Sequence, residues 1–263
     1  MVAKSERNSG YAQVAAKSPC RGAARRCAAA FGLCSALGAL LCPTRQTSRL
    51  FLCAVASLGL AAPVGAHPHI FVDTELELVF APDGEPEGIW ISWAYDPFFS
   101  MLLVSDMGLD PDFTGEVSEA ERAELDGFDM NWIEGYHGDT HVTQGGRALA
   151  LSGPVEWASD YREGQLFSRH LRRFEDIPDP AQEWVIAVYD PSYYTSYGII
   201  GTPQITGRAD CLARIYEPDW EAAGAQLQAA LDEVLGAGGD TEGDFPAVGA
   251  LFAEEVRISC AAR

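Results

Sequence analysis

The stretch Ile70-Phe71-Val72-Asp73-Thr74-Glu75-Leu76-Glu77-Leu78-Val79-Phe80 alternates between two kinds of side chain. From Val72 onward every second residue is mostly apolar, whereas the positions between them include three carboxylates. Because successive side chains of a strand point to opposite faces of a sheet, the pattern predicts a strand with one buried and one largely polar face. The turn sequence Ala81-Pro82-Asp83-Gly84 leads into a second stretch of this kind at 88–95, so the two strands are predicted to form a hairpin.

Short runs of strand-forming residues recur along the rest of the chain. We predict further strands at 141–144, 148–151, 165–174, 184–189, 207–216 and 256–260. Helices are predicted at 97–105 and 118–132, on either side of an acidic loop, and at 220–235, where Gly236 ends the last one. The sequence therefore predicts an α+β fold that is mainly β: an antiparallel β-sandwich with an EF-hand-like helix-loop-helix insertion at 97–132 and a C-terminal helix.

The first 66 residues have the pattern of an export leader. Arg45 and Arg49 precede an apolar run at 50–62, and Val64 and Ala66 occupy the −3 and −1 positions of a cleavage site. The run is shorter than the roughly 20 residues that span a bilayer, which favours export over anchoring. An earlier apolar run with its own basic lead leaves open a later translation start or a long leader. We expect residues 1–66 to be a signal peptide and 67–263 a single periplasmic domain, with no direct membrane insertion after cleavage.

The predicted exported domain is strongly acidic. The whole chain has 18 Lys and Arg against 38 Asp and Glu, and residues 67–263 retain 10 basic and 37 acidic side chains, a net charge of −27, with no lysine. Such a charge repels nucleic acid and anionic membranes and attracts cations, so no nucleic-acid partner is expected. A general adaptation of the surface to salt or solubility accounts for the charge equally well.

Cysteine usage agrees with export. Five of the seven cysteines lie in the predicted leader, and only Cys211 and Cys260 remain after it. In an oxidising compartment, two lone cysteines most simply form one structural disulfide, which would tie the end of the chain to an earlier strand. A thiolate metal site is the alternative, but neither cysteine has a second Cys or a His at ligand spacing.

The loop between the first two predicted helices matches the calcium-binding loop of an EF-hand. Residues 110–121 read Asp-Pro-Asp-Phe-Thr-Gly-Glu-Val-Ser-Glu-Ala-Glu, with glycine at the sixth position, where the loop turns sharply, and glutamate at the twelfth. The alternative is that Ser118 and Glu121 form only a helix capping box. A bound calcium ion would be structural. Its candidate ligands are Asp110, Asp112, Thr114, Glu116, Ser118 and Glu121.

A candidate transition-metal site stands at the predicted cleavage point. Cleavage after Ala66 would make His67 the first residue, so its α-amine and imidazole would form a chelating pair and His69 would add a third nitrogen. Pro68 has no amide hydrogen, which excludes the amino-terminal copper/nickel motif that uses deprotonated amides. The donor set suits Ni, Co, Zn or Cu.

A second group of candidate ligands follows in the middle of the chain. Glu134, His137 and His141 supply a carboxylate and two imidazoles, and the glycines between them indicate a loop rather than a helix. The alternative is a polar loop with scattered histidines, and whether the two histidine pairs meet in space is left open. His170 lies among three arginines, which repel a metal ion, so it is predicted at the surface or at the edge of the core.

Four motifs, taken in order, resemble those of a bacterial family of exported proteins of unknown function. They are His67-Pro68-His69-Ile70-Phe71, Trp93-Ala94-Tyr95-Asp96-Pro97-Phe98-Phe99-Ser100, the acidic loop that ends at Glu121, and Val188-Tyr189-Asp190-Pro191-Ser192-Tyr193-Tyr194. Tyr95 and Pro97 depart from the more usual Phe and Glu of the second motif. Members are described as periplasmic components of uncharacterised ABC-type or nickel/cobalt transport systems. The resemblance implies metal traffic across the envelope, without implying a reaction.

Enzyme motifs are missing from the sequence. It has no G-x-S-x-G, phosphate loop, H-E-x-x-H or dinucleotide fingerprint, and residues 67–263 have no lysine for a Schiff base. A copper histidine brace of His67 with His137 or His141 is the remaining enzymatic alternative. The leading hypothesis is a metal-binding accessory protein that is not an enzyme and that captures or delivers a transition metal for an inner-membrane transporter or permease. The chief alternative is an interaction module, stabilised by calcium and the disulfide, that docks on a transporter without binding transition metal.

Overall fold

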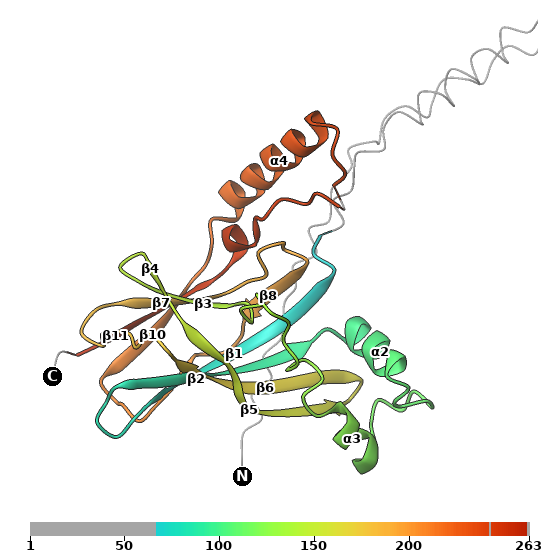
Figure 1. Cartoon of the computed structure of the whole chain (residues 1–263), viewed down its shortest axis with the longest axis horizontal. Helices are drawn as coiled ribbons and strands as arrows, with labels where there is room; N and C mark the ends of the chain where they lie inside the picture. The colour runs from blue at the N-terminus through green and yellow to red at the C-terminus, as the bar shows by residue number, and fades with distance from the viewer. Residues whose placement is uncertain (1–66, 242, 262–263) are drawn as a thin grey trace, which may run out of the picture. The chain divides into compact units, whose positions relative to one another are not determined.

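The computed structural model describes residues 67–241 and 243–261 (Figure 1), so the predicted leader lies outside the described residues. The strands are β1 (Ile70–Phe80), β2 (Pro86–Tyr95), β3 (Thr140–Gln144), β4 (Arg147–Leu149), β5 (Leu151–Arg162), β6 (Gln165–Phe174), β7 (Trp184–Val188), β8 (Thr195–Ile199), β9 (Gln204–Thr206), β10 (Cys211–Tyr216) and β11 (Glu255–Cys260). The helices are α2 (Pro97–Asp106), α3 (Glu119–Leu125), α4 (Trp220–Gly236) and the 3-10 turn η1 (Gly249–Phe252). None of the helices in this part of the chain is long and apolar enough to cross a bilayer.

The strands form two sheets. The first has the order β5-β6-β2-β1-β8, with β9 also pairing to β1, and the second has the order β10-β11-β7-β3-β4. The pairings are antiparallel, except that β1 runs parallel to β8 and β9. The predicted mainly β fold with helical additions and a C-terminal helix is therefore confirmed, and β1 adds two parallel pairings to the otherwise antiparallel sheets.

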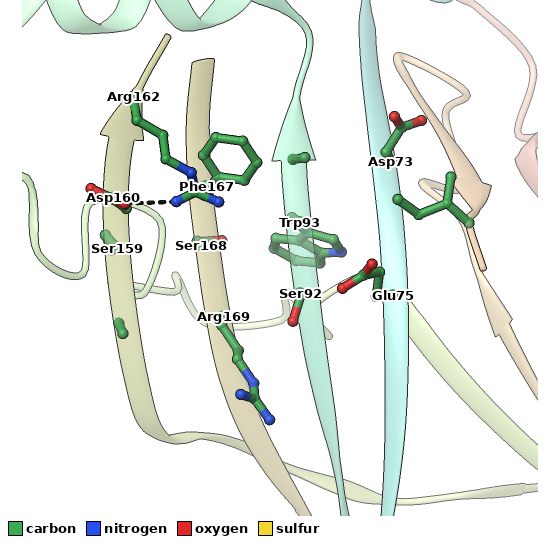
Figure 2. Close-up of a pocket in the computed structure, with 13 residues that line it drawn as sticks. Asp73, Glu75, Ser92, Trp93, Ser159, Asp160, Arg162, Phe167, Ser168 and Arg169 are labelled. Atoms are coloured by element: carbon green, nitrogen blue, oxygen red, sulfur yellow. Dashed lines mark hydrogen bonds and ion pairs between the residues drawn. The ribbon is translucent and has the colours of Figure 1, made fainter. Parts of the chain in front are cut away.

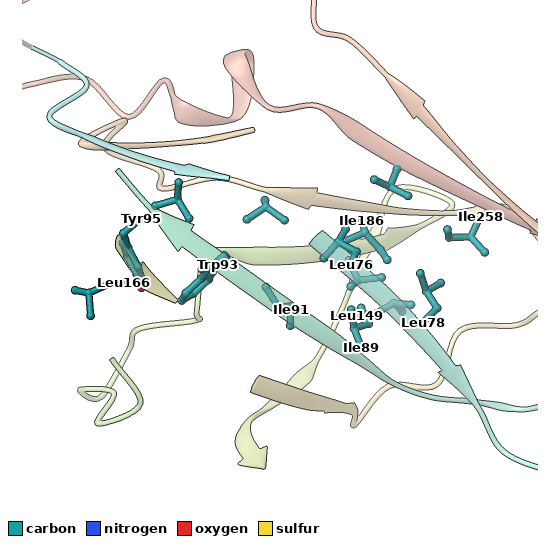
Figure 3. Packing of buried hydrophobic residues seen from close by; sticks show 14 of the residues in the cluster. Leu76, Leu78, Ile89, Ile91, Trp93, Tyr95, Leu149, Leu166, Ile186 and Ile258 are labelled. Carbon is teal, nitrogen blue, oxygen red and sulfur yellow. The ribbon is translucent and has the colours of Figure 1, made fainter. Parts of the chain in front are cut away.

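One hydrophobic core joins the two sheets (Figure 3). Leu78 and Ile89 of the first sheet and Ile186 and Ile258 of the second are all completely buried. Burying one such aliphatic side chain contributes about 1.5–3 kcal/mol, so these facing rows stabilise the packing of sheet on sheet. The aromatic ring of Phe80 extends the contact to Trp184, with 6.5 Å between ring centroids.

The alternation of apolar and polar residues along β1 decides which of its side chains face the core. Leu76 pairs with Ile91 of β2 in the antiparallel register of the predicted hairpin, and both side chains face the core. Asp73 and Glu75 point the other way and are exposed. The hairpin and the two faces of β1 are thus as the sequence predicts.

The insertion between β2 and β3 differs from the prediction in its second half. Helix α2 closely follows the predicted range, but α3 ends at Leu125 instead of continuing to residue 132. Asp126 is extended, and Gly127 has φ +73°, a conformation that ends a helix. Residues 126–139 consequently form a loop. Helix α2 contacts β6 and α3 contacts β5, at one end of the first sheet (Figure 1).

Candidate functional site

The two amino-terminal histidines lie against each other and against two aromatic rings. The ring centroids of His67 and His69 are 4.8 Å apart. His67 stacks on Phe245 at 3.8 Å, and the ring of His69 lies 4.6 Å from that of Tyr194. Ring contacts of this kind restrict the orientations of the imidazoles. The structure thus brings together the first pair of predicted metal ligands.

A turn that follows β7 holds the chain at His69. The carboxylate of Asp190 accepts hydrogen bonds from the backbone N–H groups of Ser192 (2.8 Å), Tyr194 (3.0 Å) and Thr195 (3.1 Å). The carbonyl of Tyr194 in turn accepts a hydrogen bond of 2.8 Å from the backbone N–H of His69. Asp190 therefore fixes the turn that holds the backbone of His69.

Asp96 ties the same end of β1 to helix α2. Its Oδ1 accepts the backbone N–H groups of Phe98 and Phe99, both at 2.9 Å, and so caps the helix. Its Oδ2 accepts the backbone N–H of Phe71 at 3.0 Å. One carboxylate thus connects the start of β1, beside the histidine pair, to the start of α2.

The second group of predicted ligands lies on the loop before β3 and on β3 itself. His141 stacks on Tyr189, with 3.9 Å between centroids, and its Nε2 lies 3.2 Å from the Tyr189 carbonyl oxygen. A carbonyl can only accept, so this contact places the proton on Nε2 and leaves the lone pair of Nδ1 available to a metal. Burial lowers the pKa of His141, which keeps the ring neutral near pH 7. His137 and Glu134 are exposed.

The two histidine pairs are not assembled into one ligand cluster. Across the described ranges, no three or more His, Cys, Asp and Glu side chains are placed to share a metal ion. An α-amine is not a side chain, so this observation does not concern the donor set of an amine with His67 and His69. The assignment of all five residues as metal ligands stays a prediction.

The acidic loop between α2 and α3 is organised around the carboxylate of Asp110. Its Oδ1 accepts the backbone N–H of Thr114 at 2.7 Å, and its Oδ2 accepts that of Gly115 at 2.9 Å. Burial raises the pKa of Asp110, but these hydrogen bonds outweigh burial and hold the pKa below its usual value. Gly115 has φ +78°, which a residue with a side chain rarely adopts. The backbone and one buried carboxylate thus converge at the start of the loop.

Glu121, at the other end of the loop, is shared between two backbone partners. One oxygen accepts the N–H of Ser118 at 2.8 Å, and the Ser118 hydroxyl oxygen accepts the N–H of Glu121 at 3.3 Å, so the capping box is present. The other oxygen accepts the N–H of Asp110 at 3.2 Å. Asp112, Thr114 and Glu116 are exposed. The calcium assignment of these six residues stays a prediction.

The loop at 126–139 covers a layer of buried polar groups. The Asp129 carboxylate accepts hydrogen bonds from the hydroxyls of Tyr95, at 2.8 Å, and Ser168. The Asp129 carbonyl also accepts the indole N–H of Trp132 at 2.9 Å. Burial raises the pKa of Asp129, and burial together with the neighbouring carboxylate raises that of Tyr95. The loop is thereby attached to β2 and β6.

A second carboxylate attaches the end of this loop. Oδ2 of Asp139 accepts hydrogen bonds from the hydroxyls of Tyr197 (2.8 Å) and Tyr136 (3.1 Å). Burial raises the pKa of Asp139 to about 6, although both hydroxyls lower it. The neighbouring Gly138 has φ +67°, and a Cβ there would lie 2.2 Å from the ring of Trp132. Only glycine therefore fits beside that ring.

Arg172 is the buried cation of the layer. Its side chain donates hydrogen bonds to the carbonyls of Ser152 (2.8 Å), His137 (2.7 Å) and Thr140 (3.3 Å), and the guanidinium lies 5.0 Å from the Trp132 ring centroid. Burial lowers the pKa of Arg172 to about 10, which still leaves it charged at neutral pH. Arg172 thus fixes the backbone at His137 and Thr140, in the segment that carries the second group of predicted ligands.

His170 lies in this layer, completely buried, so the prediction of a surface or core-edge histidine is wrong. The alternation of β6 explains the difference, because it points Ser168, His170 and Arg172 inward and Arg169 and Arg173 outward. The ring of His170 lies between Trp93, at 4.7 Å, and Trp132, at 5.7 Å. Neither ring nitrogen has a hydrogen-bond partner.

The outer face of the first sheet is hollowed beside β1 (Figure 2). The cavity has a volume of about 450 Å³, and Asp73 and Glu75 line it. Its two arginines are engaged locally: Arg162 bonds to Asp160 at 2.6 Å, and Arg169 bonds to a carboxylate oxygen of Glu77 at 2.6 Å. The polar face that the alternation of β1 predicts is thus one wall of an open cavity.

The family model "Protein of unknown function (DUF1007)" matches residues 52–260. The chain belongs to the DUF1007 family. No curated protein matches it. Among solved structures, AChBP from Bulinus truncatus is 8% identical, with coverage of 82% of this chain and 97% of that chain. The TM-score of 0.30 is too low to support an argument about fold or function.

Sequence reasoning missed the buried layer of this DUF1007 protein. Asp129 and Asp139 stand in a loop that was predicted in part as helix, and Tyr95 and Tyr197 stand on distant strands. The spacing of these residues gives no local signal, because they meet only when loop and sheet pack. The one available signal for this layer was the alternation of β6, because alternate residues of a strand share a face and His170 and Arg172 lie on its buried face.

The buried histidine makes the stability of the DUF1007 domain pH-dependent. Burial lowers the pKa of His170 to about 3, against 6.5 in the unfolded chain. The unfolded state therefore binds more protons between these values, and stability is lost as pH falls from 6.5 toward 3. Between pH 7.5 and 4.5 the loss is about 2–3 kcal/mol from this group. Urea unfolding of the wild type and of His170→Leu at both pH values measures it as the difference between the two proteins.

The comparison needs one competing group to cancel and one control variant. Asp139 acts in the opposite direction below pH 6, because its raised pKa makes the folded state take up the proton first. It is present in both proteins, so it cancels in the difference. His137→Leu, at an exposed position, should keep the wild-type dependence on pH. Equal pH dependence in the wild type and His170→Leu would contradict the prediction.

Proposed function

We propose that this protein is a periplasmic metal-binding accessory protein that captures or delivers a transition metal, Ni, Co, Zn or Cu, for an inner-membrane transporter or permease. The observation that supports it most is the pairing of His67 and His69, whose ring centroids are 4.8 Å apart and whose backbone at His69 bonds to the turn that Asp190 fixes. Imidazole is the commonest protein ligand for these metals. Ligands held close together before the metal arrives lose less entropy when they bind it.

The donor set proposed for the site is the α-amine of His67 with the two imidazoles. An amine and an imidazole on one residue form a chelate, and His69 adds a nitrogen from the next-but-one position. His141 is the best-prepared member of the second group, because its Nε2–H donates to a carbonyl, as is usual for metal-binding histidines. His137 and Glu134 are weaker candidates because they are exposed and have no such support.

The charge of the domain supports cation capture. With a net charge of −27 over residues 67–263, the protein attracts metal cations from solution and raises their concentration near its surface. Export is supported by the Cys211–Cys260 disulfide, which persists in oxidising compartments.

The test is a calorimetric titration of nickel, cobalt, copper, zinc and calcium into protein processed to begin at His67. One comparison protein has an additional alanine before His67, and others carry His69→Ala or the matched exposed change His137→Ala. We expect the alanine extension and His69→Ala to weaken transition-metal binding by about 100-fold or more, since each removes part of the chelate. His137→Ala should have a much smaller effect.

Two outcomes would reject the proposal. Equal affinity in the native and alanine-extended proteins would show that the amino-terminal group is not a ligand. Calcium binding without transition-metal binding would instead favour the second candidate, an envelope interaction module stabilised by an EF-hand-like calcium site and docked on a transporter. The observation that favours this candidate is the buried Asp110 carboxylate, onto which the backbone of Thr114 and Gly115 turns.

A further inference from the structure

Helix α2 exposes mainly apolar side chains, although it lies at the surface. Its sequence is Pro-Phe-Phe-Ser-Met-Leu-Leu-Val-Ser-Asp, and only Ser100 and Val104 are buried. Phe98 is 65% exposed, Leu102 49% and Met101 41%. A surface helix normally turns a polar face to solvent, and one that is apolar all round is normally covered. The outer side of α2 therefore has the composition of a contact surface.

A groove runs between this helix and the start of β1. It has a volume of about 510 Å³, and its floor and walls are mainly apolar, from Ile70 and from Phe98, Phe99, Leu102 and Leu103 of α2. His69 and Tyr194 also line it. Contiguous exposed apolar groups of this kind are characteristic of interaction sites on soluble proteins.

The charge at one end of the groove limits what can occupy it. Asp106 lines the groove in the last turn of α2, where the negative end of the helix dipole disfavours a carboxylate, and no basic residue in that turn compensates. No arginine or lysine is among the residues that line the groove. A cationic group supplied by the occupant would pair with Asp106 and with the helix C-terminus. An anionic occupant would meet repulsion from both.

We propose that this groove docks an amphipathic helix with Lys or Arg near one end, contributed by the membrane transporter of the proposed function. This inference rests on that function for the identity of the partner, and on the groove for its chemistry. Helix α2 has ten residues and is therefore about 15 Å long, which matches about three turns of a docked helix. Because His69 lines the groove, the docked helix lies against the predicted metal ligands and brings the transporter to the site of transfer.

The test uses two synthetic helices of about 18 residues, long enough to be helical, one built from Leu and Lys and the other from Leu and Glu. Fluorescence titration measures their binding to metal-free protein. We expect the Leu/Lys helix to bind, Leu102→Glu to weaken it by about tenfold or more, and Asp106→Lys to shift preference toward the Leu/Glu helix. The matched controls are Leu212→Glu, at a 58% exposed leucine of β10, and Asp232→Lys on α4, neither of which lines the groove.

Several outcomes would overturn the inference. If Asp232→Lys changes binding as much as Asp106→Lys, the peptide responds to the net charge and not to the groove. If the protein forms dimers that Leu102→Glu abolishes, the occupant is a second copy. If uncharged phosphatidylcholine vesicles bind the protein and Leu102→Glu abolishes that binding, the occupant is lipid. Metal titration of the wild type separates the two proposals. Peptide binding without transition-metal binding rejects only the proposed function, whereas metal binding without peptide binding rejects only the docking.

Discussion

Replacing Arg172 with methionine is expected to destabilise the fold by about 3–5 kcal/mol, because each buried carbonyl left without its donor costs about 1–3 kcal/mol. Arg172 is only 3% exposed, and it donates to the carbonyls of Ser152, His137 and Thr140. Methionine fills part of the space but leaves these carbonyls without their donor. Urea unfolding at neutral pH measures the loss.

The next residue along the strand provides the control. Arg173 faces outward on β6 and pairs with Glu87, and its side chain is 43% exposed. Exposed ion pairs contribute about 0–1 kcal/mol, so Arg173→Met should change stability by no more than this. The two substitutions alter the net charge equally and sit on one strand. Equal losses in both variants would show that the buried network contributes nothing beyond the charge.

The buried network also connects stability to the candidate metal ligands. Arg172 holds the carbonyls of His137 and Thr140, and Thr140 begins the strand that carries His141. Asp139, in the same backbone segment, is held by Tyr197 of β8. The position of the second histidine group is thus set by side chains from two other parts of the chain, Arg172 of β6 and Tyr197 of β8. A variant that loosens this network should alter metal binding at His141 only if His141 is a ligand.

The parts of the fold that could be predicted are those with a local signal. The hairpin of β1 and β2 was predicted because alternate burial follows directly from alternate hydrophobicity. Strand β5, at the edge of its sheet, was largely missed because most of its side chains remain at least partly exposed and show no such alternation. The parallel neighbours of β1 were missed for another reason: β8 follows more than 100 residues later, and no local pattern records which strand it joins.

The candidate site likewise has one part that the sequence predicts and another that depends on the folding of distant segments. His67 and His69 are two positions apart, so their closeness in space follows from the sequence alone. The turn that supports them depends on Asp190, far along the chain, and this contact arises only on folding. Whether His141 can join them depends on the packing of whole sheets. Short-range ligand pairs can therefore be predicted from one sequence, whereas complete ligand sets cannot.

Removing the disulfide is expected to cost about 2–4 kcal/mol of stability. Cys211 and Cys260 face each other in the register of β10 and β11, and their bond closes a loop across a separation of 49 residues. Closing such a loop limits the freedom of the unfolded chain, with a calculated contribution of about 4 kcal/mol. Urea unfolding of the Cys211→Ala, Cys260→Ala variant measures the loss. Reductant should destabilise the wild type by a similar amount and leave the variant unchanged.

The position of the disulfide also predicts which strand opens first when the disulfide is removed. Strand β10 is at the edge of its sheet and pairs only with β11 there, whereas β11 also pairs with β7. Without the bond, β10 should open before the rest of the sheet, since an edge strand has one row of ladder hydrogen bonds to lose. Amide hydrogen exchange should therefore accelerate in β10 more than in β7. Uniform acceleration in both strands would show that the bond acts only through the unfolded chain, and no acceleration would show that the β10–β11 pairing is stable without it.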